Sequence, residues 1–452
     1  MTASNAAAIG EFTGPVLRPG DAGYEAEVSG FQTAYTHRPA LVLGAAHAED
    51  VRGAVEYAAR HGLPVAVQAT GHGLSVAADG GVLITTGRMA GLTVDPLTRI
   101  ARVGAGVRAG ALIEAAARFG LAPVNGSSPS VGVVGYHLGG GIGILAREFG
   151  YAADRVRAIE LVTADGRVRR LTPADELFGA VLGTGGNFGV VTALEVELVA
   201  LAEVWGGQLV FAAELVEPAL RVWREWTATA PAAMTSTVTM LTFPDIPQLP
   251  ESLRGRYVAS FRFAYTGSAE AGELLVAPLR AVGPRLRDDL RTMPYPESHA
   301  IHSDPDHPHA YAATNAMLSE LTPDAVRGLL ALAGPDGPMD VVLEIRHLGG
   351  ALRRPADNAV DFRAAEYAVR VIAMPDAAAG AAAPGELARV REVLAPWTLG
   401  HNLNFLYGAG AAADDAQTGA GYRPETFALL GKLKSKYDPT NMFRFNRNIA
   451  PR

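Results

Sequence analysis

Apolar and polar positions in the first 200 residues change repeatedly between a strand pattern and a helix pattern. Apolar residues recur at helical spacing and are followed by glycine over 48–62 and 107–120, which predicts two helices. Asp165-Gly166 stands between two alternating runs, which predicts a β-hairpin. Short apolar runs typical of buried strands lie at 38–46, 63–69, 81–86 and 100–106. This mixture of strands and helices indicates an α+β fold.

The pattern changes near Trp205. Longer runs of alternating apolar and polar residues follow, and they predict strands of an antiparallel sheet that has one face covered. These runs lie at 206–212, 235–243, 255–265 and 340–350. Helical segments at 217–230 and 322–333 lie between them, and the chain closes with a helix and an extended, asparagine-rich segment. We therefore expect a second domain in which helices flank an antiparallel sheet.

Composition excludes several classes of protein. The chain has 452 residues and a formal charge of −7, whereas nucleic acids and anionic membranes require clustered positive charge. It has no cysteine, and its only lysines are Lys432, Lys434 and Lys436, which excludes disulfides, thiolate chemistry, a P-loop and a Schiff base. The first residues show no leader pattern and no run is long enough to span a membrane, which predicts a cytoplasmic protein.

Glycine is concentrated in a few segments whose backbone must pass close to another group. The densest runs from Val124 to Val156, and shorter ones lie at 68–73 and 183–191. Free N–H groups in such segments can bind phosphate, although glycine also permits tight packing of a helix against a sheet. The spacing is not the GxGxxG of a dinucleotide-binding βαβ unit. His72 lies between two glycines, and taken alone it indicates a turn histidine without a role.

Together with the C-terminal KYDPTNMFRFNRNIAP, these segments resemble the FAD-linked oxidases of the vanillyl-alcohol oxidase (PCMH-type) superfamily. The C-terminal segment makes the chain most similar to the berberine-bridge-enzyme-like branch. The resemblance implies an α+β protein with a PCMH-type FAD-binding domain at 1–204 and a substrate-binding domain at 205–403. Residues 404–452 would form a C-terminal segment that returns to the FAD domain.

The resemblance also implies which residues bind FAD. His72 matches the histidine that many relatives bond to the 8α-methyl of the flavin. Such a bond raises the redox potential of the flavin. Ser128 stands where doubly linked relatives have a cysteine, so a chain without cysteine would carry a single covalent bond. The other matching positions are Ala69, Thr70, Gly71 and Gly73, then Ser127, Gly132, Gly135, His137, Gly140, Gly141 and Gly143, then Gly189, Val190 and Val191, and in the tail Asn446 and Asn448.

Candidate catalytic residues lie on the run VVLEIRHLGG, which matches the family's substrate-facing strand. Because side chains alternate along a strand, Glu344 and Arg346 share one face. There Glu344 would act as a base or amine anchor, and Arg346 would bind an anion. The alternative is an ion pair on a solvated face. Asn404 matches an asparagine near the reactive side of the flavin, and Asn402 replaces a tyrosine that carries catalysis in some sugar oxidases.

Three histidines lie close together in the sequence HSDPDHPH, at His302, His307 and His309. Such a group could indicate a metal site. However, the spacing fits no helix face and the stretch contains two prolines, so we expect a solvated loop and no metal.

On this resemblance the chain is an FAD-dependent oxidase. It would pass a hydride from a small alcohol, an amine or a natural-product intermediate to flavin N5, and O2 would accept the electrons to give H2O2. One alternative is a dehydrogenase that uses another acceptor, and another is an oxygenating tailoring enzyme of secondary metabolism. A protein that keeps flavin only as a scaffold is a third, against which the complete glycine set and His72 argue. We expect no nucleic-acid or membrane partner.

Overall fold

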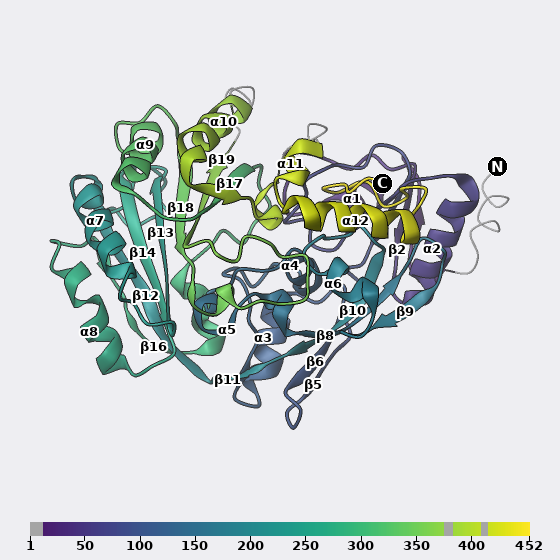
Figure 1. Ribbon diagram of the computed structural model, residues 1–452, viewed down its shortest axis with the longest axis horizontal. Helices are drawn as coiled ribbons and strands as arrows, with labels where there is room; N and C mark the ends of the chain where they lie inside the picture. Colours follow the sequence, from purple (N-terminus) through teal and green to yellow (C-terminus); the bar gives the residue numbers. More distant parts are fainter. Residues whose placement is uncertain (1–11, 375–382, 408–414) are drawn as a thin grey trace.

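The N-terminal and C-terminal parts of the chain lie together in one half of the molecule, and the middle of the chain forms the other half (Figure 1). The structure is a computed structural model that describes residues 12–374, 383–407 and 415–452. Residues 1–11, where we expect no leader, lie outside the described residues.

The first half contains a small sheet that packs against helices α1 (Tyr24–Val28) and α2 (Ala48–His61). Helix α2 ends near the predicted boundary because Gly62 takes a left-handed φ of 63°, which glycine adopts without strain. Strands β2, β4 and β3 are parallel, and β1 pairs antiparallel with β2. The order across the sheet is β1 (Val16–Leu17), β2 (Leu41–Gly44), β4 (Val82–Thr85) and β3 (Val65–Gln68).

A second, antiparallel sheet shares one apolar core with the first. Its order is β5 (Leu92–Asp95), β6 (Ile100–Gly104), β10 (Val190–Glu197), β8 (Val156–Val162) and β9 (Val168–Leu171). Strands β8 and β9 form the hairpin predicted at Asp165-Gly166. The same half contains α3 (Ala109–Ala117), α4 (Val133–Leu138), α5 (Ala146–Phe149), α6 (Glu176–Val181) and the pair β7 (Leu121–Ala122) and β11 (Val199–Ala200).

The other half is a nine-stranded antiparallel sheet with helices on its outer face (Figure 1). Its order is β15 (Arg287–Asp288), β12 (Glu203–Ala212), β14 (Tyr257–Tyr265), β13 (Met234–Thr242), β18 (Val341–His347), β19 (Tyr367–Ala373), β17 (Ala312–Leu318) and β20 (Thr398–Gly400), with β16 (Arg291–Pro294) also paired to β12. The helices are α7 (Val216–Thr227), α8 (Ala269–Arg280), α9 (Pro323–Ala333) and α10 (Ala383–Leu394).

Both faces of this sheet are buried, so the prediction of a single covered face is wrong. Leu343 and Ile345 pack in the core formed with the outer helices. On the inner face, Val204 and Met293 pack with Ile113 of the first half. The pattern alternates because the inner face also carries Thr, Ser, Glu and Arg side chains that are buried rather than solvated. Polarity in these strands therefore marks an interface between the two halves.

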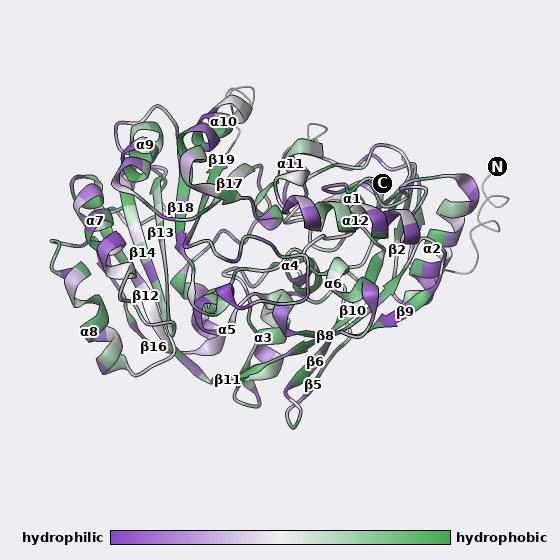
Figure 2. Cartoon of the chain, in the orientation of Figure 1, coloured by the Kyte–Doolittle hydropathy of each residue, from purple (hydrophilic) through white to green (hydrophobic). Residues whose placement is uncertain are grey.

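Short helices complete the described chain. The 3₁₀ turns are η2 (Ala152–Arg155), η3 (Ala213–Leu215), η4 (Tyr295–Ile301), η5 (Gly350–Arg353), η6 (Ala395–Trp397) and η7 (Leu403–Phe405), and α11 (Asp415–Gly419) precedes the last helix. Figure 2 shows that helices such as α7, α8 and α12 (Pro424–Tyr437) carry hydrophilic and hydrophobic residues on different sides. Within the described ranges, no helix is both long and apolar enough to cross a membrane.

A buried ion pair attaches the C-terminal tail to the first half. Lys434 and Asp438 are fully buried, and 2.8 Å separates Nζ from Oδ2. Lys434 Nζ also donates to the carbonyl oxygens of Asn187 and Phe443. The Asp438 carboxylate accepts the backbone N–H groups of Met442 and Phe443. One of the three lysines of the chain therefore holds the tail in place.

We expect Lys434→Met to lower the free energy of unfolding by about 3–5 kcal/mol, because it leaves a buried carboxylate without its counter-charge. Urea unfolding at pH 7 measures the loss. Lys432→Met, at an exposed position of the same helix, is the matched control and should change stability by about 0.5 kcal/mol or less. A loss as small as that of the control would show that the ion pair does not hold the tail.

Candidate functional site

The turn that carries His72 follows strand β3 and depends on glycine. Gly71 has a left-handed φ of 73°, and a Cβ at this position would lie 2.7 Å from the Cα of Gly30. Glycine is the residue that meets both restrictions. Among the described residues, the backbone N–H groups of Gly71, His72 and Gly73 have no acceptor. The turn therefore presents free donors of the kind that bind phosphate oxygens.

His72 is held between an aromatic ring and two hydroxyl groups. Its ring stacks on Phe31, with 3.7 Å between centroids and 12° between planes. Nδ1 lies 2.9 Å from Thr70 Oγ1, and Nε2 lies 3.0 Å from Ser130 Oγ. Burial, and then the positive charge of Arg108, lower the pKa of His72 to about 4. At neutral pH the imidazole is therefore uncharged, with a lone pair on one ring nitrogen.

Two predicted cofactor segments that are distant in the sequence meet at His72. Ser130 Oγ, which contacts His72, lies 2.8 Å from Ser128 Oγ. A Cβ on Gly132 would lie 3.6 Å from Thr70, so that the two segments are also in contact there. The structure thus brings Ala69–Gly73 and Ser127–Gly132 together. Ser127 in turn donates a hydrogen bond to Asp304, which belongs to the other half of the molecule.

The remaining glycines of the densest segment divide into two kinds. A Cβ on Gly141 would lie 2.7 Å from Tyr136, and a Cβ on Gly143 would lie 2.3 Å from the carbonyl oxygen of Asn125. These glycines, with Gly140 at 3.2 Å from Val360, permit close packing. By contrast, no atom lies within 4 Å of the Cβ position of Gly135. Close packing therefore explains Gly140, Gly141 and Gly143, whereas packing does not explain Gly135.

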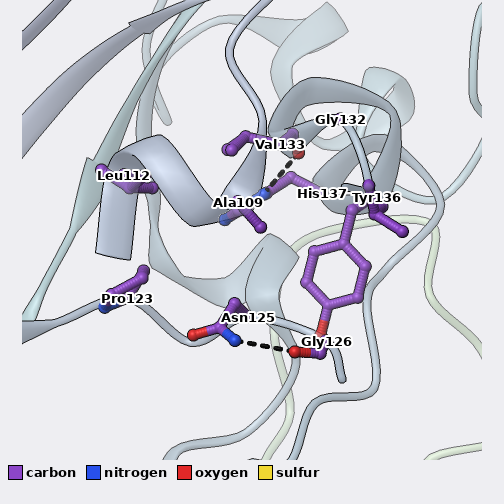
Figure 3. A pocket seen from close by; sticks show the side chains of 10 residues that line it. Ala109, Leu112, Pro123, Asn125, Gly126, Gly132, Val133, Tyr136 and His137 are labelled. Atoms are coloured by element: carbon purple, nitrogen blue, oxygen red, sulfur yellow. Dashed lines mark hydrogen bonds between the residues drawn. The ribbon is translucent and has the colours of Figure 1, made fainter. Parts of the chain in front are cut away.

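His137 lies on helix α4 and lines the small pocket shown in Figure 3. Its Nδ1 lies 2.8 Å from the carbonyl oxygen of Val133 in the same helix, and burial lowers its pKa to about 4. Asn125 Nδ2 donates to the carbonyl oxygen of Gly126 at 2.7 Å, beside the Tyr136 ring (Figure 3). The lining residues are Ala109, Leu112, Pro123, Asn125, Gly126, Val131, Gly132, Val133, Tyr136 and His137. His137 thus contacts its own helix.

The C-terminal tail lies against the third glycine segment. Asn187 Nδ2 donates to a carbonyl oxygen of the tail at 3.0 Å, and Asn187 Oδ1 accepts the N–H of Ile449 at 2.9 Å. The side-chain oxygens Oδ1 of Asn446 and Asn448 are buried and accept no hydrogen bond from the described residues. Of the predicted positions, Val190 and Val191 begin β10, and Gly189 directly precedes that strand.

These features fit a dinucleotide cofactor. The His72 turn supplies unpartnered N–H donors for phosphate oxygens, and Asn446 and Asn448 supply buried acceptors for the N–H or O–H groups of a nucleotide. A buried polar atom without a partner costs about 1–3 kcal/mol, so these oxygens indicate a partner outside the described residues. The donors are backbone groups, as a chain with so few lysines requires.

Glu344 and Arg346 form a buried ionic group on the inner face of the large sheet. Glu344 is 2% exposed, and its two oxygens lie 2.6 Å from Arg346 Nε and 3.0 Å from Arg370 Nη2. Burial opposes the charge of Glu344, but the two guanidinium groups outweigh it and hold its pKa well below the usual range. The solvated pair considered from the sequence is therefore wrong. A carboxylate paired this strongly is a weak proton acceptor.

His302 and Arg262 lie beside this ionic group. His302 is 5% exposed, and burial followed by the charge of Arg262 lowers its pKa to about 3. For His302 the predicted solvated loop is thus wrong, because the loop folds inward and Ser127 holds Asp304. His307 is exposed, as predicted. In the described part of the chain, no three His, Asp or Glu side chains are arranged to hold a metal ion.

Asn404 lies next to the ionic group but contacts the glycine-rich helix. Its Nδ2 donates to the carbonyl oxygen of Tyr136 at 3.0 Å, and a Cβ on Gly139 would overlap its side chain. The neighbouring Phe405 contacts both guanidinium groups, with its centroid 5.3 Å from Arg346 and 4.9 Å from Arg370. Asn404 therefore positions helix α4, and Phe405 faces the charges.

Sequence reasoning did not identify Arg262 or Arg370, and it placed His302 in a solvated loop. Arg370 lies directly opposite Glu344 in the pairing of β18 with β19. Arg262 lies opposite Thr237, which in turn lies opposite Arg346. Arg262 and Arg370 each lie in the middle of an otherwise apolar strand, and this pattern is the signal that indicates them. A buried charge lowers stability unless it has a partner.

Three buried histidines predict a loss of stability in mild acid. Burial is the first cause that lowers the pKa of His137 to about 4, His302 to about 3 and His347 to about 2. The unfolded chain binds these protons below about pH 6.5, whereas the folded chain does not. Their stabilisation is therefore complete above pH 6.5 and is lost as the pH falls toward the folded pKa values. Near pH 5 these three histidines alone contribute a slope of about 4 kcal/mol per pH unit.

Urea unfolding between pH 7.5 and pH 5 measures this slope. His347→Gln keeps an acceptor for Arg147 Nη1, which lies 2.7 Å from His347 Nε2, and removes one titrating group. We expect it to reduce the slope by about 1.4 kcal/mol per pH unit. His307→Gln, at an exposed position, is the control that should leave the slope unchanged. Equal slopes in all three proteins would contradict the account of the buried histidines.

Two family models match the chain. One, described as an FAD binding domain, matches residues 39–172, and the other, described as berberine and berberine like, matches residues 414–450. The first covers the His72 turn and most of the glycine-rich segment. The second covers the tail with Asn446 and Asn448.

Similar proteins extend over nearly the whole chain. (R)-6-hydroxynicotine oxidase of Paenarthrobacter nicotinovorans is 29% identical over 467 aligned positions, which cover 97% of each chain. The crystal structure of 6-hydroxy-D-nicotine oxidase from Arthrobacter nicotinovorans has a TM-score of 0.82 and 28% identity, and covers 98% of this chain and 99% of that one. A carbohydrate oxidase from Microdochium nivale, at 21% identity, 99% coverage of both chains and a TM-score of 0.83, shares the fold.

Proposed function

We propose that His72 holds the flavin through a single covalent bond and that O2 is the electron acceptor. The ground for this proposal is that the chain belongs to the berberine-bridge-enzyme-like FAD-linked oxidases. The substrate is a small alcohol, an amine or a natural-product intermediate. Bound FAD would supply a hydride acceptor at N5, and the hydride and one proton of the substrate would then reach O2 as H2O2.

The observation that carries the proposal is the neutral His72 at the meeting point of the two cofactor segments. An uncharged imidazole nitrogen is a nucleophile, whereas a protonated one is not. Stacking on Phe31 and the hydroxyl groups of Thr70 and Ser130 fix the ring. Ser128, at the position of the second link in doubly linked relatives, offers a hydroxyl group instead of a thiol. The link is therefore single.

The other residues of the site would bind the cofactor and activate the substrate. The N–H groups of Gly71–Gly73 would hold phosphate oxygens, and the buried oxygens of Asn446 and Asn448 would accept hydrogen bonds from the nucleotide. Arg346 presents positive charge to an oxygen or other electron-rich atom of the substrate, which favours loss of its proton. Glu344 acts through Arg346 and Arg370, whose guanidinium groups it fixes, and is a positioning residue. Phe405 excludes water from their faces.

The test is the reaction of the reduced enzyme with oxygen. The purified holoenzyme is reduced by dithionite without air, freed of excess reductant and mixed with aerated buffer. We expect the flavin spectrum to return within seconds and one H2O2 to form for each flavin. A reduced enzyme that persists in air but is oxidised by a quinone would contradict the choice of O2 and favour the dehydrogenase.

A further inference from the structure

The inner face of the large sheet carries more positive than negative charge where it meets the glycine-rich segment. Three guanidinium groups face two carboxylates there, and the neighbouring His302 is neutral. The charged residues are Arg262 on β14, Glu344 and Arg346 on β18, Arg370 on β19, and Asp304 on the loop that follows η4. Two phenols, Tyr136 and Tyr407, also lie near these charges, and burial raises the pKa of Tyr136 above its usual range.

Of these three guanidinium groups, Arg262 is the one that has no paired carboxylate among the described residues. Arg346 and Arg370 each bond to an oxygen of Glu344. Arg262 Nη1 donates only to the hydroxyl group of Thr239, and no carboxylate of the described residues lies within ion-pair distance of it. Burial lowers the pKa of Arg262, and Asp304 and Glu344 do not fully compensate. The charge balance is thus incomplete at this residue.

The free edge of Arg262 has the shape that a carboxylate requires. Its Nε is buried and has no hydrogen-bond partner among the described residues, and no bond of its Nη2 to them is seen. The N–H groups of Nε and Nη2 lie along the same edge of the planar guanidinium group, so together they can bind both oxygens of one carboxylate. His302 Nδ1, also buried without a partner, lies in the same charged group.

We propose that the substrate of this oxidase carries a carboxylate and that the free edge of Arg262 binds it. This rests on the proposed function, since it names the substrate class of the same site. A monoanion would balance the third guanidinium group, whereas a neutral alcohol, sugar or cationic amine would leave it uncompensated in a buried interface. Arg262 is therefore the residue that selects the substrate by charge.

The test measures binding to the oxidised holoenzyme and needs no turnover. Benzoate and acetate are titrated against the neutral benzamide and acetamide, and the shift of the flavin absorbance reports the dissociation constants. We expect at least one carboxylate to bind at least tenfold more tightly than its amide. If neither carboxylate binds more tightly than its amide, the proposal is overturned without any variant.

Variants then assign the preference to Arg262. Arg262→Gln should remove the preference for the carboxylate, and Arg262→Lys, which keeps the charge but loses the two-point contact, should retain part of it. Arg221→Gln, at an exposed position of helix α7, is the matched control and should bind as the wild type does. If Arg262→Gln keeps the preference, another residue binds the carboxylate and the proposal is wrong.

The alternative role of the positive charge on Arg262 is to stabilise the reduced flavin. A second measurement distinguishes this role from binding of a substrate carboxylate. The midpoint potential of the flavin is determined in the wild type and in Arg262→Gln. A lowered potential with unchanged benzoate affinity would overturn the proposal, whereas an unchanged potential with lost benzoate affinity supports it. Failure of the oxidase proposal would be seen separately, as a reduced flavin that is inert to O2 while ligand binding to the oxidised form persists.

Discussion

His72→Ala is expected to yield a protein whose intact mass is that of the polypeptide alone and whose yellow colour leaves with the supernatant after acid precipitation. The reason is that His72 is the neutral nucleophile fixed between Phe31, Thr70 and Ser130. Loss of the bond also removes its electron withdrawal from the flavin. A fall in potential of about 60 mV would make hydride transfer about a hundredfold less favourable at equilibrium.

Two controls separate the anchor from its surroundings. Ser130→Ala removes one hydrogen bond of His72 but keeps the imidazole, so the covalent flavin should remain. His137→Gln alters another buried histidine of similar pKa, which contacts its own helix, and should also keep the flavin attached. A covalent flavin that survives in His72→Ala would move the anchor to another residue.

Glu344→Leu is expected to lower the free energy of unfolding by about 3–5 kcal/mol, because it leaves the guanidinium groups of Arg346 and Arg370 without their shared carboxylate. We also expect turnover to fall about a hundredfold or more, since Arg346 is no longer held in place. Urea unfolding gives the first value, and O2 consumption with a substrate that reduces the wild type gives the second.

A double variant separates stability from activity. Glu344→Leu/Arg346→Leu removes one charge of each sign and so keeps the charge balance of the wild type. Stability should recover only in part, because Arg346 no longer stands unpaired but Arg370 still lacks the carboxylate of Glu344. Turnover should stay low. Glu297→Leu, which breaks an exposed ion pair with Arg291, is the control for both values. Recovery of turnover in the double variant would show that the pair serves stability alone.

Much of the fold follows from local patterns. The hairpin at Asp165-Gly166 and the glycine-terminated helix α2 form where the sequence predicts, because each depends on the conformation of one or two residues. The large sheet was also predicted, but its second covered face was not. An alternating pattern reports polarity, and it does not distinguish a solvated face from a buried polar interface.

The ionic group shows why half of the site escaped prediction. Glu344 and Arg346 are two residues apart on one strand, so their shared face follows from the strand period. Arg262 and Arg370 join them only through strand pairing, and His302 through a loop that folds inward. No spacing along the chain contains that information. The burial of these residues changes the chemistry as well, since it makes Glu344 a partner of arginines rather than a free base.

The proposed function depends on one flavin being bonded to His72. Mass spectrometry of a tryptic digest tests it most directly, because cleavage after Arg60 and Arg88 releases residues 61–88 as one peptide. We predict that this peptide carries the mass of one FAD, with fragment ions that place it on His72 rather than on His61. An unmodified 61–88 peptide from yellow, FAD-loaded protein would contradict the claim.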